Sequence, residues 1–454
     1  MDPRIGAGEV TAALDVGGVE ERVRSGPADS VSGDGRLVAV VLAGYPVAWA
    51  IGLGPAVFMI AACFMAIWLI RHRPLMVPNG TIMLALFLVL VLASSIEVNS
   101  PGRIGVWVLR TGWYASGLIT WMFLARQTSP RARRLIVYSL LATWFMTLFG
   151  GLASFVVPDL SWRTPLSSIL PNVIATDQFV KDLIEPRVAE VQTFFPDIRL
   201  NRPAAPYAYT NAWGSSMALL TPFVIAFLHD RRLRVSRPLV VVALLLSAIP
   251  FYYALNRGAW LTLGIGLVYG LVRYAAIRRR FLPIVLLVGL GVVSLLAVTA
   301  TGVTSAAMEQ LDTRTADSND TRVSIYAETI RYSADSPLIG FGTPRPNPSK
   351  PSGPPLGTHG QLWAIMFAHG YVAVVLYVGF FIGAFLRARG RDPVTHWAKV
   401  SLAIGILQVP IYGHLPTQLF VMVVAAAIAT WPPDALGDPS HDVPAEPDPA
   451  LVGL

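Results

Sequence analysis

The chain has 454 residues, of which 54% are hydrophobic and 14% are charged. Soluble domains carry roughly 25% charged residues, so this composition excludes an ordinary soluble protein and indicates an integral membrane protein. The formal net charge of +8 comes from arginines clustered between apolar runs, which is typical of a membrane topology signal and not of a nucleic-acid-binding surface.

The apolar runs predict an all-α, polytopic membrane protein. Residues 1–35 are polar, contain no short apolar segment of a signal peptide, and predict a disordered tail. The expected transmembrane domain covers 36–431, and the Pro/Asp-rich residues 432–454 predict a second disordered tail. A helix needs about 20 apolar residues to cross a bilayer. About twelve spans are expected, at 37–53, 55–70, 81–97, 104–125, 135–157, 211–228, 238–255, 258–275, 282–301, 361–386, 397–412 and 416–431.

The connections between these spans alternate in charge. Those after the second, fourth, sixth, eighth and tenth spans are basic, whereas the opposite short connections carry mainly Arg103 and Arg257. Basic connections stay in the cytoplasm, so both termini are expected to be cytoplasmic and two long loops, 158–210 and 302–360, external. The second loop lies between spans nine and ten. Loops of this length are usually functional or disordered, so it is either the site of chemistry or a mobile, solvated segment.

Three arginines on the expected outer side are candidates for binding an anion. Arg110 lies a turn or two inside the fourth span, and Arg257 lies at the external mouth between two spans. Arg322 begins a stretch, 321–333, that predicts an amphipathic helix. Arginine binds phosphate bidentately and stays charged in a low dielectric, which predicts a site for a lipid diphosphate or another anion. The alternative is that each side chain only reaches lipid headgroups or is structural.

Three histidines lie on or near the expected outer face. His359 follows the long loop, His369 lies within the next span, and His414 lies in a short external turn. A general base must titrate near the working pH and reach a substrate hydroxyl. His359 fits by position, with anchoring of the loop as the alternative, and no role is predicted for His369 or His414.

The sequence predicts no metal site and no cofactor. The external loops contain neither His-Glu-x-x-His nor Asp-x-Asp, and the chain has no GxxxxGK motif. The one cysteine, Cys63, permits no disulfide and no cysteine metal site. Carboxylates are nearly absent from the spans. The scarcity of carboxylates argues against a proton-coupled transporter. The nearest case is Glu97, at the end of the third span, which has Arg103 as its candidate partner.

Three short motifs occur in order. Arg257-Gly258-Ala259-Trp260-Leu261 opens a span, Arg322 precedes Pro-Leu-Ile-Gly-Phe-Gly at 337–342, and His359 closes the long loop with Gly370 eleven residues later. They resemble the Arg-x-x-x-Leu motif, the loop arginine with Pro-Leu-x-Gly-x-Gly, and the His motif of one superfamily. It is the O-antigen ligase and O-antigen polymerase superfamily of bacterial membrane glycosyltransferases.

The resemblance covers roughly 205–375, and the amino-terminal half is similar only in hydropathy. Two positions depart from the family pattern. Gly360 follows the histidine where Asn, Ser or Gln is usual, and Ala373 stands where a second glycine is usual.

The resemblance implies metal-independent, inverting transfer of a glycan on the external face of the bacterial cytoplasmic membrane. The donor would be a polyprenyl-diphosphate-linked glycan and the acceptor a hydroxyl of a glycan or glycolipid, among membrane lipids and without nucleic acid. The leaving diphosphate gains negative charge, and without a metal a cationic group must meet it. Arg257 and Arg322, with Arg110 as a third candidate, would bind the diphosphate. His359 would take the acceptor proton or orient the hydroxyl.

Two other functions remain open from the sequence. About twelve spans suit a polysaccharide or lipid exporter, although internal repeats and buried carboxylates are missing. A non-catalytic membrane scaffold would use the long loop only for docking. Ligase and polymerase share the same donor chemistry and differ in acceptor, so the sequence leaves both open.

Overall fold

The computed structural model describes residues 35–72, 77–169, 178–195, 198–279, 322–351, 353–432 and 435–437. The expected span 282–301, the first part of the long loop and nearly all of both expected tails lie outside these residues. The labelled helices are α2 (Arg36–Ala50), α3 (Gly54–Arg71), α4 (Thr81–Ala93), η2 (Ser94–Glu97), α5 (Pro101–Ala125), α6 (Pro130–Val156), α7 (Pro165–Ile169), α9 (Gln178–Ile184), α10 (Thr210–His229), α11 (Arg237–Tyr253), α12 (Arg257–Arg278), α15 (Gln361–Arg387), α16 (Pro393–Gln408) and α17 (Thr417–Ala429). A further helix covers residues 322–333.

The mostly helical fold that hydropathy predicts is confirmed and is consistent with a membrane protein, whereas the number of spans and the placement of the loops stay predictions. Each expected span other than 282–301 coincides with a helix. Among the described helices, five are long and apolar enough to cross a bilayer: α3, α6, α10, α12 and α15. The helices α2, α4 with η2, α11 and α17 are apolar but shorter.

Several helices begin where the sequence places a short polar residue before a proline. Ser129 Oγ accepts from the amide of Ala132 at the start of α6, and Asp392 Oδ1 accepts from the amide of Thr395 at the start of α16. Each cap satisfies one amide that lacks a partner in the first turn, and the following proline already has a helical φ. These boundaries are therefore local properties of the sequence.

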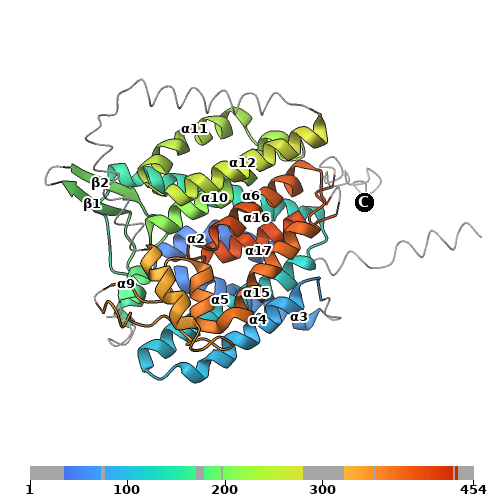
Figure 1. Ribbon diagram of the computed structural model, residues 1–454. Coiled ribbons are helices and arrows are strands. Elements are labelled where there is room, and N and C mark those ends of the chain that lie inside the picture. The colour runs from blue at the N-terminus through green and yellow to red at the C-terminus, as the bar shows by residue number, and fades with distance from the viewer. Residues whose placement is uncertain are drawn as a thin grey trace, which may run out of the picture.

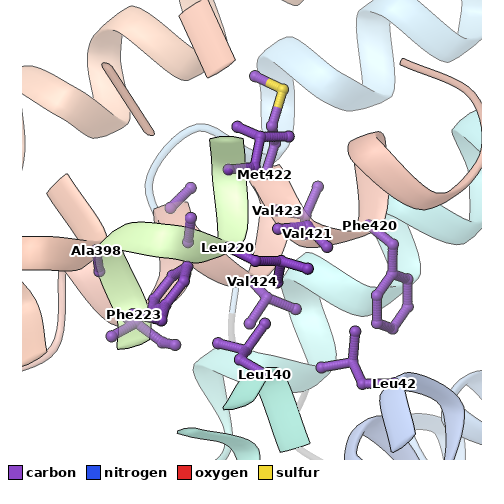
Figure 2. Packing of buried hydrophobic residues seen from close by; sticks show 14 of the residues in the cluster. Leu42, Leu140, Leu220, Phe223, Ala398, Phe420, Val421, Met422, Val423 and Val424 are labelled. Atoms are coloured by element: carbon purple, nitrogen blue, oxygen red, sulfur yellow. The ribbon is translucent and has the colours of Figure 1, made fainter. Parts of the chain in front are cut away.

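The core of the bundle is formed by α10, α16 and α17. Leu220 and Phe223 of α10 pack with Val421 and Val424 of α17, as Figure 2 shows. Every residue of α17 is buried. A helix that is apolar on all sides belongs inside a protein, which explains how this short segment lies in the middle of the bundle and not against lipid.

The expected external loop 158–210 contains a structure that the all-α prediction missed. Strands β1 (Ala189–Phe195) and β2 (Ile198–Pro203) form an antiparallel pair in which Glu190 lies opposite Arg202. In the sequence, β1 holds Val191, Thr193 and two phenylalanines, and β2 alternates Ile198 and Leu200 with polar residues, on either side of Pro196-Asp197. Such alternation is a strand signal. The hairpin lies with α9 at one end of the bundle, beside the orange chain of residues 322–360 (Figure 1).

The basic connections contact one another. Arg126 Nη2 donates to the carbonyl of His72, at 3.1 Å, and Arg387 Nη2 donates to that of Asn79, at 3.2 Å. Arg232 is 3.5 Å from Asp392. Connections far apart in the sequence are thus gathered together, as the charge alternation requires.

Candidate active site

The segment 337–342 of the long loop is fixed to α15 by main-chain hydrogen bonds. The amides of Phe341 and Gly342 donate to the carbonyls of Phe367 and Ala368, both at 2.8 Å. These carbonyls are accessible because α15 is broken at Gly370, whose φ of 85° and ψ of 175° are not helical. The Pro-Leu-x-Gly-x-Gly segment and the glycine after the His motif therefore meet in space.

Two glycines permit this contact. A Cβ on Gly340, where φ is +68°, would lie 2.4 Å from the amide nitrogen of His369. A Cβ on Gly370 would lie 2.6 Å from the carbonyl of Leu338. Both neighbours are backbone atoms, which cannot move aside as a side chain can. The motif spacing is therefore explained by close packing of two backbones.

Replacement of Gly370 by alanine is expected to lower the free energy of unfolding by about 1–3 kcal/mol, because the backbone conformation at position 370 is strained for any residue with a Cβ. Thermal unfolding of the purified protein in detergent measures the effect. Gly264→Ala in α12 is the matched control, since no atom lies within 4 Å of a Cβ there. It should leave stability unchanged or raise it by up to about 1 kcal/mol. Equal unfolding temperatures for the two variants would contradict this explanation of the motif.

Two further arginines hold the same segment against the start of α5. Arg103 Nη2 donates to the carbonyl of Phe341, at 2.6 Å, and Arg103 Nε donates to Thr343 Oγ1, at 2.9 Å. The carboxylate of Glu97 pairs with Arg345, at 3.2 Å, and not with Arg103 as expected. The expected pairing was wrong because Arg103 reaches the carbonyl of Glu97 instead, at 3.1 Å, while its other nitrogens bind the loop.

His359 lies at the end of the loop with one ring nitrogen available. Thr358 Oγ1 donates its hydrogen to the carbonyl of Pro355, at 2.6 Å, and is 2.9 Å from His359 Nδ1. Because that hydroxyl has only one hydrogen, Nδ1 must carry the ring proton and donate to Oγ1. Nε2 is then the unprotonated nitrogen, and it has no hydrogen-bond partner among the described residues. The residue as a whole is exposed, and protein atoms cover part of its ring, so the unprotonated Nε2 is a candidate proton acceptor.

The helix over residues 322–333, which the pattern at 321–333 predicted, places Arg322 beside His359. Tyr326, one turn later, stacks on Trp363 with ring centroids 4.6 Å apart, and its hydroxyl donates to the carbonyl of His359, at 2.9 Å. The pKa of His359 lies below its ordinary value because surrounding protein atoms desolvate the ring and because the Arg322 guanidinium adds positive charge. The structure thus brings together two of the predicted site residues.

Arg202 of β2 joins this group and was not predicted. Burial lowers the pKa of Arg202. Glu190 and Tyr412 oppose the shift, and Arg322 adds to it, so all three lie within electrostatic range. Arg202 Nε donates to the carbonyl of Ala254, at 2.9 Å, which fixes the hairpin to the end of α11. No motif marks Arg202, and the only signal was an arginine in a strand-like run of the first long loop.

Arg257 is the first residue of α12 and is exposed. The Tyr412 hydroxyl donates to Asn256 Oδ1 and interacts with the amides of Gly258 and Ala259. Since Tyr412 is also within electrostatic range of Arg322, the start of α12 borders the same group. The Arg257 side chain makes no hydrogen bond or ion pair with any residue that the structure describes.

Arg110 lies apart from these residues. Its guanidinium interacts electrostatically with Tyr114 and His369 and lies 5.8 Å from the ring of Phe179. Its buried Nε has no partner in the described part of the chain. The connection to His359 is indirect. Gln361, two residues after it, donates to the Tyr114 hydroxyl, at 2.7 Å.

The two remaining histidines are buried. His369 Nδ1 is 2.8 Å from Ser94 Oγ, which donates its own hydrogen to the carbonyl of Val91. His414 is fully buried, and its amide donates to Gln361 Oε1, at 3.0 Å. Neither ring lies on the surface that His359 and Arg322 share. His359 is therefore the exposed histidine of the three.

Comparison with known proteins agrees with the motifs. A search of curated proteins and a search of solved structures each found no match. The family model described as O-antigen ligase matches residues 242–378. The matched range contains Arg257, Arg322 and His359, while Arg110 and Arg202 precede it. This match confirms the similarity of the chain to the O-antigen ligase and polymerase superfamily.

Proposed function

We propose that this protein transfers a glycan from a polyprenyl diphosphate to a hydroxyl of an acceptor glycan or glycolipid, as an O-antigen ligase or polymerase does. The observation that carries the proposal is that Arg322 lies close to His359. Arg322 has no counter-ion among the described residues, and His359 presents an unprotonated Nε2 close to it. A free cation beside a free base suits a reaction that expels an anion while an alcohol is deprotonated.

The proposed step breaks the bond between the anomeric carbon and the diphosphate oxygen and forms a bond from that carbon to the acceptor oxygen. The acceptor attacks opposite the leaving group, so the anomeric configuration inverts. Its proton passes to His359 Nε2, and the electron pair of the broken bond leaves on the diphosphate. Arg322 and Arg257 would bind the departing diphosphate, and Arg202 would add positive charge beside them.

Arg110 is proposed as a third diphosphate ligand, acting from deeper in the bundle. An arginine inside a helix bundle is costly unless an anion or a dipole offsets its charge. Its neighbours Tyr114 and His369 supply no negative charge, and no carboxylate that the structure describes pairs with it. A phosphate that enters between α5 and α15 would offset the charge.

Turnover in proteoliposomes tests the proposal. The purified protein, a polyprenyl-diphosphate-linked oligosaccharide and a glycolipid acceptor should yield the elongated acceptor and free polyprenyl diphosphate, and the yield should survive EDTA. An exporter would move the donor across the bilayer without forming product. A scaffold would bind it without either change. Loss of activity on chelation, with recovery on adding Mg²⁺ or Mn²⁺, would contradict diphosphate binding by arginines alone.

The site is proposed to face outward, with both termini in the cytoplasm. In a Cys63→Ser background, single cysteines replacing Gln192 and Lys350 should react with a membrane-impermeant thiol reagent in intact cells. A cysteine replacing Arg234, on a basic connection, should react only after lysis. The reverse pattern would invert the topology. All three positions lie at or near the protein surface, so differences in labelling report the side of the membrane.

A further inference from the structure

A polar groove of about 520 Å³ lies at the base of the hairpin, outside the group around His359. One wall comes from residues 158–161 after α6, and the other comes from the start of β1. The walls are joined by main chain, since the amide of Val188 donates to the carbonyl of Leu160, at 3.0 Å. The groove therefore has a fixed shape, and its volume lies within the range of about 300–1,000 Å³ typical of small-molecule sites.

The polar groups that line the groove are only partly engaged. Asp159 pairs with Arg199. Glu190 Oε1 accepts from the amide of Thr210, at 3.1 Å. Arg187 lies 3.7 Å from Asp182 and from Glu190, beyond hydrogen-bond distance, and makes a single hydrogen bond, to the carbonyl of Ala208. Its Nε is buried without a partner in the described residues. An arginine has five N–H donors, so the terminal nitrogens of Arg187 keep donors that a ligand could use beside its two ion pairs. Gln192 makes no side-chain hydrogen bond to any residue the structure describes.

The charge pattern of the groove selects against ions of either sign. Asp159 is already paired with Arg199, and Glu190 lies 3.7 Å from Arg187, so an added ion of either sign would meet a like charge within each pair. A neutral ligand rich in hydroxyl groups would use acceptors and donors together. Leu160 and Val191 add apolar surface, which the C–H groups of a sugar ring can contact.

The groove adjoins the proposed active site through Glu190. That carboxylate lies on the groove wall and is within electrostatic range of Arg202, which in turn interacts with Arg322. Because Glu190 and Arg202 lie opposite each other on β1 and β2, a chain-like ligand in the groove could extend past Glu190 toward Arg202 and Arg322. This placement suits the extended part of a substrate whose reacting end lies at His359.

We infer that this groove is a carbohydrate subsite that binds the neutral glycan portion of a substrate, away from the diphosphate. The inference rests on the proposed glycosyl transfer. The glycan belongs either to the donor or to the acceptor, and the two have the same chemistry at the groove. Gln192 is the residue through which it is best tested, because it lines the groove and touches none of the proposed catalytic residues.

The experiment compares Gln192→Trp, which fills the groove, with Lys181→Trp, a control on α9. The native Lys181 side chain is half exposed, and its one ion pair among the described residues is with Glu185. In proteoliposomes, Gln192→Trp should raise KM at least about tenfold for whichever substrate places its glycan in the groove. Its kcat should stay within about twofold of native. Gln192→Ala should raise the same KM by a smaller factor. Native KM values for both substrates in Gln192→Trp would overturn the inference.

A binding measurement separates this inference from the proposed function. Saturation-transfer NMR on the purified protein uses neutral trisaccharides of glucose, galactose, mannose and rhamnose. Saturation transfer that persists in Lys181→Trp and disappears in Gln192→Trp supports the groove, even if the native protein shows no turnover and the proposed function fails. Absence of transfer from the native protein to every trisaccharide would overturn the groove.

Discussion

Replacement of Arg322 or Arg257 by alanine is expected to lower turnover per folded molecule by about 10²–10³-fold, the scale seen when one preorganised donor to a developing anion is lost. Lysine should rescue poorly at either position, because it supplies a point charge without the planar fork that binds two phosphate oxygens. The measurement is initial rate in proteoliposomes, divided by the folded protein present, together with donor affinity. Arg331→Ala, at an exposed position on the Arg322 helix, is the matched control and should be near native.

A structural role for Arg322 makes a different prediction. If the side chain only stabilised the loop, folded protein in the membrane would fall in proportion to activity. The most local partner, Glu328, is already hydrogen-bonded to Asn347. Normal donor affinity and turnover in both Arg322→Ala and Arg257→Ala would exclude the diphosphate site.

His359→Ala is expected to lower turnover by about 10²–10⁴-fold, the range of general acid–base catalysis, while donor affinity stays near native. Thr358→Val is a companion variant, because it removes the hydroxyl that holds the Nδ1 proton. It should lower turnover less than His359→Ala, since the ring remains but its tautomer is no longer fixed. Near-native specific turnover in His359→Ala would remove the base assignment and leave His359 as a loop anchor.

The pH profile gives an independent check on the same residue. A base must be unprotonated to act, so kcat/KM should fall as pH drops through the pKa of His359, which lies below 6.5. The Arg322 charge disfavours the protonated ring. The residual activity of Arg322→Ala should therefore show an acid limb at higher pH than native. An unmoved limb in Arg322→Ala, or the same upward shift in Arg331→Ala, would show that the two groups do not interact.

The local features of this protein could be predicted from its sequence. Apolar runs locate the helices, and short motifs single out Arg257, Arg322 and His359, because hydropathy and motif spacing are read along the chain. Two features depend on contacts between distant segments. Arg202 reaches Arg322 only because a hairpin forms in the first long loop, and Glu97 pairs with Arg345 only because the second loop returns to α5. Such pairings follow from packing in three dimensions, which no single window of sequence reports.

The junction of segment 337–342 with the break in α15 bears on protein engineering. Exchanging the second long loop between relatives is a natural way to alter substrate choice. Here the loop is seated on the carbonyls of Phe367 and Ala368 and held by Arg103, all outside its own sequence. A transplanted loop would lose these contacts unless the start of α15 and the α4–α5 corner were taken from the same relative. The transferable unit is thus a discontinuous module of three chain segments.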